Sequence, residues 1–298
     1  MSEAKGIRLR FERCPCCDSR DFVNYFTNQT PKPIIGWQNF FYGNWSYISD
    51  IFQCVRCKYG FINTPAENME HFYRIQDTME YIAKKEFRVE YFQLVKKTLE
   101  QQNLLSGLSS AKILDLGCAD GEWLSLWKEQ SELYGTEISP DFVPLLQRKS
   151  ITVVDSQNLG GLCFDMISMF DYLEHVQDPR IEISKIKTHL AGSGYLLLGV
   201  PDMGKFIASL LRQRYYLYSP MHLSYFTEDS LRSLLMRIFP EACMINIFPS
   251  PAMKADLRTL VKWLRLPLAI HSKLNIQIPF GYSASLIAIV RTGRGDGD

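Results

Sequence analysis

The sequence contains no apolar run of about 18 residues, the approximate length that a membrane-spanning helix requires. Its longest apolar stretches, such as Tyr195–Val200 and Leu286–Val290, have the length of buried strands. The segment 1–14 carries charges and lacks the apolar core of a signal peptide. We therefore expect a cytoplasmic protein without a membrane partner, in which cysteine thiols stay reduced.

The chain also lacks an excess of charge of either sign. It has 33 basic and 32 acidic residues, which gives a formal net charge of +1. Because a nucleic-acid-binding surface must be basic to neutralise phosphates, no nucleic-acid partner is expected. The apolar share of 46% is typical of a globular protein. At 298 residues, the chain is long enough for one large domain and a small one.

Cysteine is plentiful, and five of the eight cysteines lie near the N-terminus. Four of them form two Cys-x-x-Cys pairs, Cys14 with Cys17 and Cys54 with Cys57. Two such pairs are typical of a tetrahedral Zn²⁺ site with four thiolate ligands. A site of this kind has no open coordination position, so we expect structural Zn²⁺. Cys16 could replace either neighbour, and four buried thiols without metal are the alternative.

Three regions of the chain differ in composition. Residues 1–65 hold the cysteine pairs and are expected to form a small zinc-ribbon-like module. Gly60 follows the second pair, where a metal-binding turn commonly needs a permissive backbone. The aromatic residues in 37–47 either fill the core of this module or close a pocket. Residues 66–107 are expected to be a helical linker because their apolar residues follow one side of a helix, and residues 108–298 to form the large domain.

From Ala111 onward, short apolar runs alternate with amphipathic segments. This alternation predicts an α/β fold with a Rossmann-like, doubly wound and mostly parallel sheet. Thr227 is the expected cap of a late helix. The expected strands are 112–116, 133–137, 152–154, 165–169 and 194–200, with a final pair at 244–248 and 285–291, and the expected helices are 121–130, 141–149, 179–189 and 228–238.

The most specific local pattern is the segment 113–121, Ile-Leu-Asp-Leu-Gly-Cys-Ala-Asp-Gly. An apolar strand there carries an acid, Asp115, and a turn leads into a helix expected to start near Gly121. Gly117 and Gly121 allow a tight turn and let the main chain approach a ligand with no Cβ in the way. In an open α/β sheet, the crevice at the carboxyl ends of the strands binds ligands, and a helix start directs N–H groups into it.

A second acid, Glu137, ends the next expected strand, where a carboxylate can accept both hydroxyls of a ribose. This pairing would also suit a dinucleotide-binding dehydrogenase. A glycine at 119 and a small residue at 122 would then be needed, but the sequence has Ala119 and Glu122. A pyrophosphate would also meet the charges of Asp115 and Asp120. These details favour a sulfonium cofactor.

The segment resembles the first motif of class I S-adenosylmethionine-dependent methyltransferases, and further motifs of that family follow in order up to Pro201. The resemblance implies direct methyl transfer by in-line displacement at the sulfonium carbon. It places Asp115 near the methionine end of the cofactor and Glu137 on the ribose hydroxyls. The implied cofactor-binding residues are Asp115, Gly117, Ala119, Gly121, Glu137, Asp155, Ser156 and Asp171. A doubly wound fold with an unrelated ligand is the alternative.

Together, the cysteine module and these motifs resemble bacterial small-molecule methyltransferases, including deoxysugar C-methyltransferases, that carry an N-terminal zinc-binding domain over the substrate pocket. The resemblance implies a small-molecule acceptor. It makes His222 a candidate general base, within an H-x-x-Y-F pattern that includes Tyr225. A loop histidine that braces the following helix is the alternative. His175 is a further candidate, either structural or lining the cofactor pocket.

The sequence departs from the sugar C-methyltransferases next to His222. Those enzymes have a carboxylate beside the histidine and a tyrosine three residues before it, whereas this chain has Met221 and Ser219. Since removing a proton from carbon needs stronger assistance than removing one from a hydroxyl, we expect O-methylation, with C- or N-methylation as alternatives. Arginines among tyrosines in 210–218 could clamp an acidic acceptor or form a solvated lid helix. A non-catalytic protein that keeps the fold is the alternative of another class.

Overall fold

The computed structural model describes residues 9–26, 50–63, 85–205, 208, 218, 221–255, 280–283 and 285–293. The aromatic cluster in 37–47 and most of the arginine- and tyrosine-rich segment 210–218 lie outside the described residues. No helix within the described part of the chain is long and apolar enough to cross a membrane.

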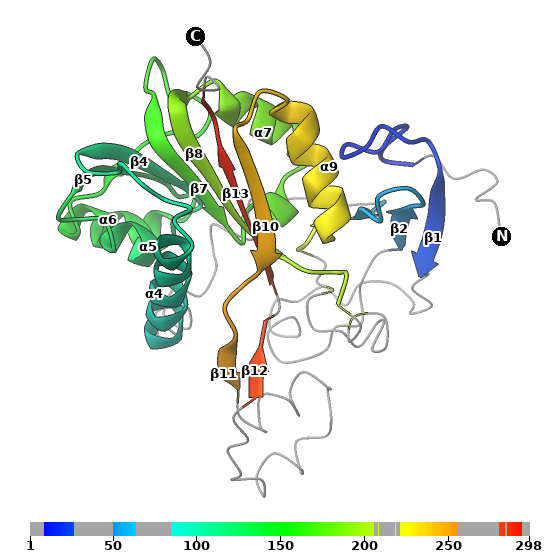
Figure 1. Ribbon diagram of the computed structural model, residues 1–298, viewed down its shortest axis with the longest axis horizontal. Coiled ribbons are helices and arrows are strands. Elements are labelled where there is room, and N and C mark those ends of the chain that lie inside the picture. Colours follow the sequence, from blue (N-terminus) through cyan, green and yellow to red (C-terminus); the bar gives the residue numbers. More distant parts are fainter. Residues whose placement is uncertain are drawn as a thin grey trace, which may run out of the picture.

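A seven-stranded sheet forms the centre of the molecule (Figure 1). Its strands are β4 (Ala111–Leu116), β5 (Ser131–Thr136), β6 (Thr152–Val153), β7 (Phe164–Phe170), β8 (Leu190–Pro201), β10 (Met244–Pro249) and β13 (Ser285–Arg291). Their order is β10-β13-β8-β7-β4-β5-β6. The neighbouring strands from β8 through β7, β4 and β5 to β6 pair in parallel, whereas β13 pairs antiparallel with both β8 and β10. The mostly parallel α/β sheet and its closing pair are therefore confirmed.

Helices cover both faces of this sheet. They are α4 (Lys85–Gln101), α5 (Glu122–Ser125), α6 (Val143–Arg148), α7 (Pro179–Lys187) and α9 (Glu228–Ile238), with short 3-10 turns η1 (Pro140–Phe142) and η2 (Leu173–His175). Helices α4, α5 and α6 lie on one side and α7 and α9 on the other (Figure 1). The predicted helix 121–130 is shorter than expected, because Leu126 and Trp127 bond to carbonyls three residues back.

The central strand β8 shows why the sheet is buried on both faces. Leu196 and Leu198 pack in the cluster that contains α7 and α9, whereas Tyr195 and Leu197 pack in the cluster that contains α4 and α5. Successive side chains of a strand point to opposite faces, so a continuous apolar run supplies both layers.

A second, smaller sheet joins the N-terminal module to the large domain. It contains β1 (Phe22–Phe26), β2 (Ile51–Cys54), β3 (Gly60–Ile62) and β9 (Ser224–Tyr225), all antiparallel and in this order. Strand β9 lies in the chain between β8 and α9, so the large domain supplies the last strand of the small sheet. Sequence patterns did not predict this pairing. A separate hairpin of β11 (Met253–Ala255) and β12 (Phe280–Tyr282) extends below the large sheet in Figure 1.

Helix α9 begins at the predicted cap, Thr227. The Ser230 amide donates to Thr227 Oγ1 at 3.2 Å, and the Thr227 amide donates to Ser230 Oγ at 2.8 Å. Thr227 Oγ1 also donates to the Cys57 carbonyl at 3.1 Å. One hydroxyl therefore caps α9 and ties it to the cysteine module.

We expect Thr227→Ala to lower the free energy of unfolding by about 1–2 kcal/mol, because the helix loses its cap and the Cys57 carbonyl loses a donor. Thr227→Ser keeps the oxygen and is the matched control. Urea unfolding of the three proteins measures the effect. Equal stability of Thr227→Ala and wild type would show that the cap contributes nothing.

Candidate active site and four-cysteine cluster

The turn after β4 has three residues with left-handed backbone: Gly117 (φ 71°), Ala119 (φ 46°) and Gly121 (φ 73°). A Cβ on Gly121 would lie 2.5 Å from Cδ1 of Ile151, and a Cβ on Gly117 would lie 2.8 Å from a ring carbon of Tyr172. The space beside Gly121 is thus filled by the protein's own side chains. We expected both glycines to clear space for a ligand, but at Gly121 the missing Cβ allows packing against Leu146 of α6 and Ile151, which precedes β6.

Glu137 holds this turn in place. Its Oε2 accepts from the Ala119 amide at 2.9 Å, and its Oε1 accepts from the Ser139 amide at 2.7 Å. Burial raises the pKa of Glu137, and the bonds from these amides oppose the shift. The side chain is only partly buried, so its remaining lone pairs can meet a ligand.

Asp115 lies deeper, in β4. It is almost fully buried, and Ser168 Oγ of the neighbouring strand β7 donates to its Oδ1 at 2.7 Å. Burial raises the pKa of Asp115 to about 7, and the Ser168 hydrogen bond opposes this shift. Sequence analysis missed Ser168, although a serine within the apolar run of β7 is a detectable signal.

The other predicted cofactor residues follow β6 and β7. Asp155 is exposed and accepts from the Gln157 amide at 2.8 Å, while the Ser156 carbonyl accepts from Lys185 at 2.6 Å. Asp171 is exposed, with left-handed backbone (φ 49°). Because β7, β4, β5 and β6 are adjacent and parallel, all the predicted cofactor residues lie along one edge of the sheet, at the carboxyl ends of these strands.

Helix α4 clamps the same turn with charged side chains. Arg88 forms an ion pair with Asp120 at 2.7 Å, and Lys85 forms one with Glu122 at 2.9 Å. Lys149 reaches Glu122 from the other side, at 2.6 Å. The charge of Asp120 therefore faces Arg88, a contact between distant segments that local sequence patterns do not reveal.

The three candidate catalytic residues come together. The rings of His175 and His222 have centroids 4.9 Å apart, and the His222 and Tyr225 rings are 6.2 Å apart. His175 Nδ1 lies 2.9 Å from the Met221 carbonyl, an acceptor, so this nitrogen carries the proton. Burial lowers the pKa of His175 to about 4, and the bond to Met221 opposes the shift. Tyr225 itself is buried in β9.

Glu174 is the residue that sequence analysis missed here. It is 1% exposed, and within the segments that the structure describes neither carboxylate oxygen has a hydrogen-bond partner. Oε1 lies 3.9 Å from His175 Nε2. Burial and the charge of Asp171 raise the pKa of Glu174 well above its usual range. Glu174 in η2 thus brings a carboxyl group close to both histidines, and an acid beside His175 in a buried stretch was the signal for it.

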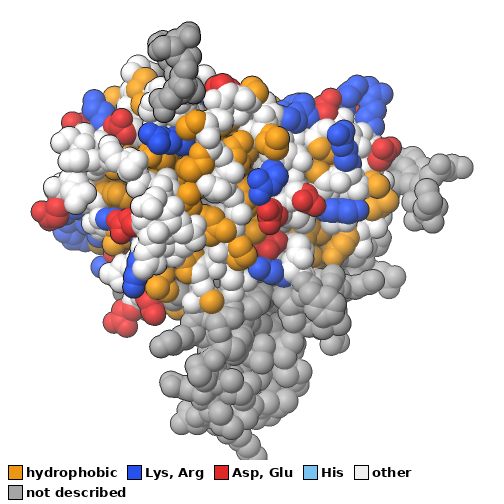
Figure 2. Space-filling view, viewed as in Figure 1, with side chains coloured by type: hydrophobic (Ala, Val, Ile, Leu, Met, Phe, Trp, Pro, Cys, Tyr) orange, Lys and Arg blue, Asp and Glu red, His pale blue; other side chains and the backbone are white. Residues whose placement is uncertain are grey.

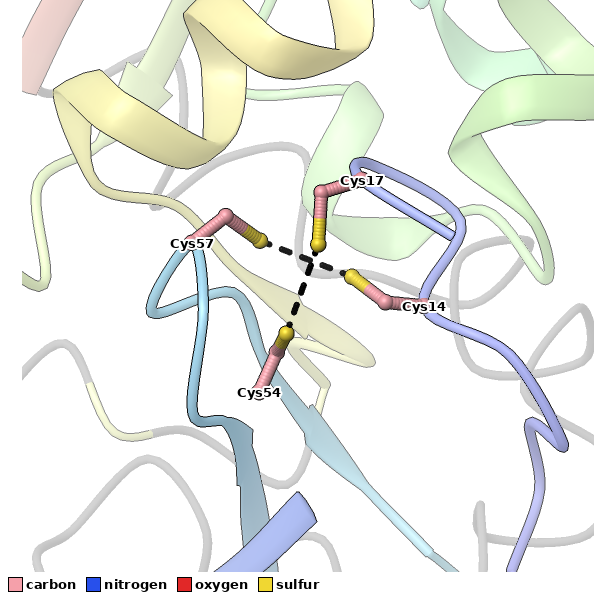
Figure 3. A group of neighbouring side chains, drawn as sticks. All are labelled: Cys14, Cys17, Cys54 and Cys57. Carbon is pink, nitrogen blue, oxygen red and sulfur yellow. Dashed lines mark hydrogen bonds between the residues drawn. The ribbon is translucent and has the colours of Figure 1, made fainter. Parts of the chain in front are cut away.

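The four cysteines of the two pairs also meet (Figure 3). Their sulfur atoms lie within 4.8 Å of one another, with Cys14 and Cys57 at 3.5 Å and Cys17 and Cys54 at 3.5 Å. Ligands about 2.3 Å from a tetrahedral metal would be about 3.8 Å apart. This four-cysteine cluster is consistent with a zinc site. Cys16 is buried nearby but does not belong to the group.

The two cysteine turns share a backbone feature that differs from our expectation. Asp18 (φ 65°) and Lys58 (φ 63°) are left-handed, each directly after the second cysteine of its pair. Their amides donate to the carbonyls of Cys14 and Cys54, at 2.9 and 3.0 Å. Lys58 therefore occupies the position that we assigned to Gly60. Gly60 lies in β3, where its missing Cβ admits the Met203 side chain.

The cysteine module contacts the segment that carries His222. The Tyr59 hydroxyl lies 2.6 Å from Ser224 Oγ, and the Leu223 carbonyl accepts from the Ile62 amide at 3.2 Å and from Arg10 at 3.1 Å. Together with the β3–β9 pairing, these bonds fix the backbone directly after His222.

Comparison with known proteins identifies the large domain. A sequence profile described as a methyltransferase domain matches residues 70–238, more than half of the chain. The chain belongs to this methyltransferase family. The enzyme is thus a class I S-adenosylmethionine-dependent methyltransferase, as the motifs predicted. No functionally curated protein matches the sequence significantly.

Solved structures share the fold of this methyltransferase. An S-adenosylmethionine-dependent methyltransferase from Thermotoga maritima, described as a possible histamine N-methyltransferase, is 17% identical; the match covers 75% of this chain and 99% of that one, with a TM-score of 0.52. The plantazolicin methyltransferase BpumL, in complex with S-adenosylhomocysteine, is 14% identical. The match covers 76% of this chain and 94% of BpumL, with a TM-score of 0.53.

We expect Glu137→Ala to weaken binding of S-adenosylhomocysteine about 10–150-fold, because hydrogen bonds to a charged group contribute about 1.5–3 kcal/mol. Isothermal titration calorimetry measures this change. Glu132→Ala, which changes an exposed acid in β5, the strand that Glu137 follows, is the matched control and should bind normally. Normal affinity in Glu137→Ala would remove Glu137 from the cofactor site.

Proposed function

We propose that the enzyme transfers the methyl group of S-adenosylmethionine to a hydroxyl oxygen of a small metabolite. The observation that carries this proposal is the pairing of His175 and His222, 4.9 Å apart, after the strand that neighbours the cofactor turn. Two structural neighbours are named for small-molecule acceptors, plantazolicin and histamine, which supports this class of substrate. The near-neutral charge of the chain fits it as well. On the face drawn in Figure 2, basic and acidic side chains of the described residues are interspersed.

In this proposal, the eight predicted cofactor residues hold the donor along the carboxyl edge of β7, β4, β5 and β6. The acceptor lies over η2 and the segment that carries His222. Holding donor and acceptor in line can supply about 7–11 kcal/mol of the barrier reduction. Bond formation between the acceptor oxygen and the methyl carbon breaks the carbon–sulfur bond, and S-adenosylhomocysteine leaves.

We assign to His222 the role of assisting the loss of the acceptor's hydroxyl proton. His175 and Tyr225, whose rings lie next to that of His222, fix the position of the His222 ring. Met221 and Ser219 stand where the sugar C-methyltransferases have a carboxylate and a tyrosine, and removing a proton from carbon needs stronger assistance than removing one from a hydroxyl. O-methylation therefore remains the preferred chemistry, over the alternatives of C- or N-methylation.

His222→Ala should slow methyl transfer by about 10²–10⁴-fold and leave S-adenosylhomocysteine binding intact. Transfer from labelled donor into a panel of hydroxylated metabolites, with mass spectrometry of the product, gives both the rate and the methylated atom. His189→Ala is a matched control, since this histidine contacts the Leu162 carbonyl instead. An unchanged rate in His222→Ala would make this residue a brace.

We also propose that the four-cysteine cluster holds one structural Zn²⁺. The spacing of its sulfur atoms fits the ion. Because all four ligands come from the protein, the ion would leave no position for substrate. Its contribution would be to the stability of the module, and through β3 to β9.

Purified protein passed through EDTA should retain about one zinc per chain by elemental analysis, and Cys54→Ser should retain much less. Cys243→Ser, which changes an exposed thiol, is the control and should keep its zinc. A stably folded wild-type protein without metal would refute the zinc site.

A further inference from the structure

A second group of metal-ligating side chains lies away from the cysteines. Glu174, His175 and His222 each offer one ligand atom, and these atoms all lie within 4.8 Å of one another. Glu174 and His175 come from η2, whereas His222 comes from the segment before β9. The group therefore forms only when two distant parts of the large domain pack together.

The buried carboxylate is the observation that points to a ligand. Glu174 is 1% exposed, and both of its oxygens lack a hydrogen-bond partner among the described residues. Within the part of the chain that the structure describes, no lysine or arginine forms an ion pair with it, and the charge of another acid, Asp171, acts on it unfavourably. Buried carboxylates are normally paired, hydrogen-bonded or bound to a metal, since an uncompensated one is costly.

The histidine geometry is also that of a metal ligand. His175 Nδ1 donates to the Met221 carbonyl at 2.9 Å, which fixes the ring and turns Nε2 toward Glu174 Oε1, 3.9 Å away. Ligating histidines characteristically donate their other N–H to a carbonyl or carboxylate in this way. Met221 is the neighbour of His222, so one short segment both orients the first histidine and supplies the second.

The distances suit a small cation. Ligand atoms about 2.0–2.2 Å from a metal lie at most about 4.4 Å apart, so the three side chains need to shift by less than about 1 Å. Two imidazoles and one carboxylate suit divalent first-row metals such as Mn²⁺, Fe²⁺ and Zn²⁺, and three protein ligands leave positions open.

We propose that Glu174, His175 and His222 form a second metal site, which takes a divalent cation on nitrogen and oxygen ligands. Three protein ligands leave positions open, and the oxygen atoms of a hydroxylated substrate that lies over η2 can complete the coordination. The cation withdraws electron density from the substrate oxygen, so the hydroxyl loses its proton more readily, and solvent accepts that proton. His222 assists this step as one of the ligands of the cation. This last step rests on the proposed function, whereas cation binding does not.

The test uses full-length protein treated with EDTA, with the four-cysteine cluster still loaded with zinc. Mn²⁺ alone is the probe, because it prefers oxygen and nitrogen ligands to thiolates. Free Mn²⁺ is counted by electron paramagnetic resonance during titration. Wild type should bind about one Mn²⁺ per chain, and added Zn²⁺ should displace it.

Glu174→Gln and His222→Ala should each weaken Mn²⁺ binding at least about tenfold. Glu241→Gln, an exposed acid paired with Lys187, is the matched control and should bind normally. S-adenosylhomocysteine binding reports the fold of each variant, and if Glu174→Gln does not fold, His222→Ala decides. Absence of Mn²⁺ binding by wild type, or normal binding by a folded variant, overturns the site. Failure of the proposed function would appear differently, as normal Mn²⁺ binding without transfer to any hydroxylated acceptor.

Discussion

The antiparallel pairing of β3 with β9 is the interaction on which the arrangement of the site depends. It places Gly60 opposite Tyr225 and Phe61 opposite Ser224, so the backbone next to His222 is part of the cysteine module's sheet. The module is therefore an integral part of the site: its cluster, its aromatic core and the cap of α9 all fix the same short segment. The core reflects this continuity, since Cys57, Tyr59 and Phe226 belong to the same buried cluster as the α9 leucines.

Acidic side chains dominate the edge of the large sheet. Asp115, Glu137, Asp155 and Asp171 lie at the carboxyl ends of its parallel strands, and Asp120 is balanced by Arg88. An anionic cofactor would be repelled by this edge, whereas the sulfonium and ammonium groups of S-adenosylmethionine would be attracted. The electrostatics of the folded protein thus agree with the family to which the chain belongs.

Local patterns in the sequence predicted much of this structure. The alternation of apolar and amphipathic segments predicted the mostly parallel sheet. The cap at Thr227 has the expected geometry, and the two Cys-x-x-Cys pairs meet in one cluster. These features depend on residues close together in the chain, or on rules that hold for all open α/β sheets. The residues that the family motifs predict to bind the cofactor likewise lie at one edge of the sheet.

The features that sequence analysis missed depend on contacts between distant segments. Nothing near Ser224 indicates that β9 pairs with β3, and nothing near Arg88 indicates its bond to Asp120. The permissive backbone position was misplaced for a different reason: Lys58 accepts a left-handed conformation because its amide bonds to the Cys54 carbonyl. Residue type alone, which favoured Gly60, does not show where a hydrogen bond will stabilise a strained residue.

The pairing of β3 with β9 also constrains how the chain reaches its native state. Tyr59 and Ser224 are 165 residues apart, and their hydroxyls meet only when the intervening α/β core has formed. During synthesis the strands β1 to β3 leave the ribosome before β9, so their sheet keeps an open edge until β9 has been made. Such non-local pairing slows folding and exposes an unpaired strand to aggregation until β9 pairs with it. The cysteine module is therefore translated before the large domain but completed only together with it.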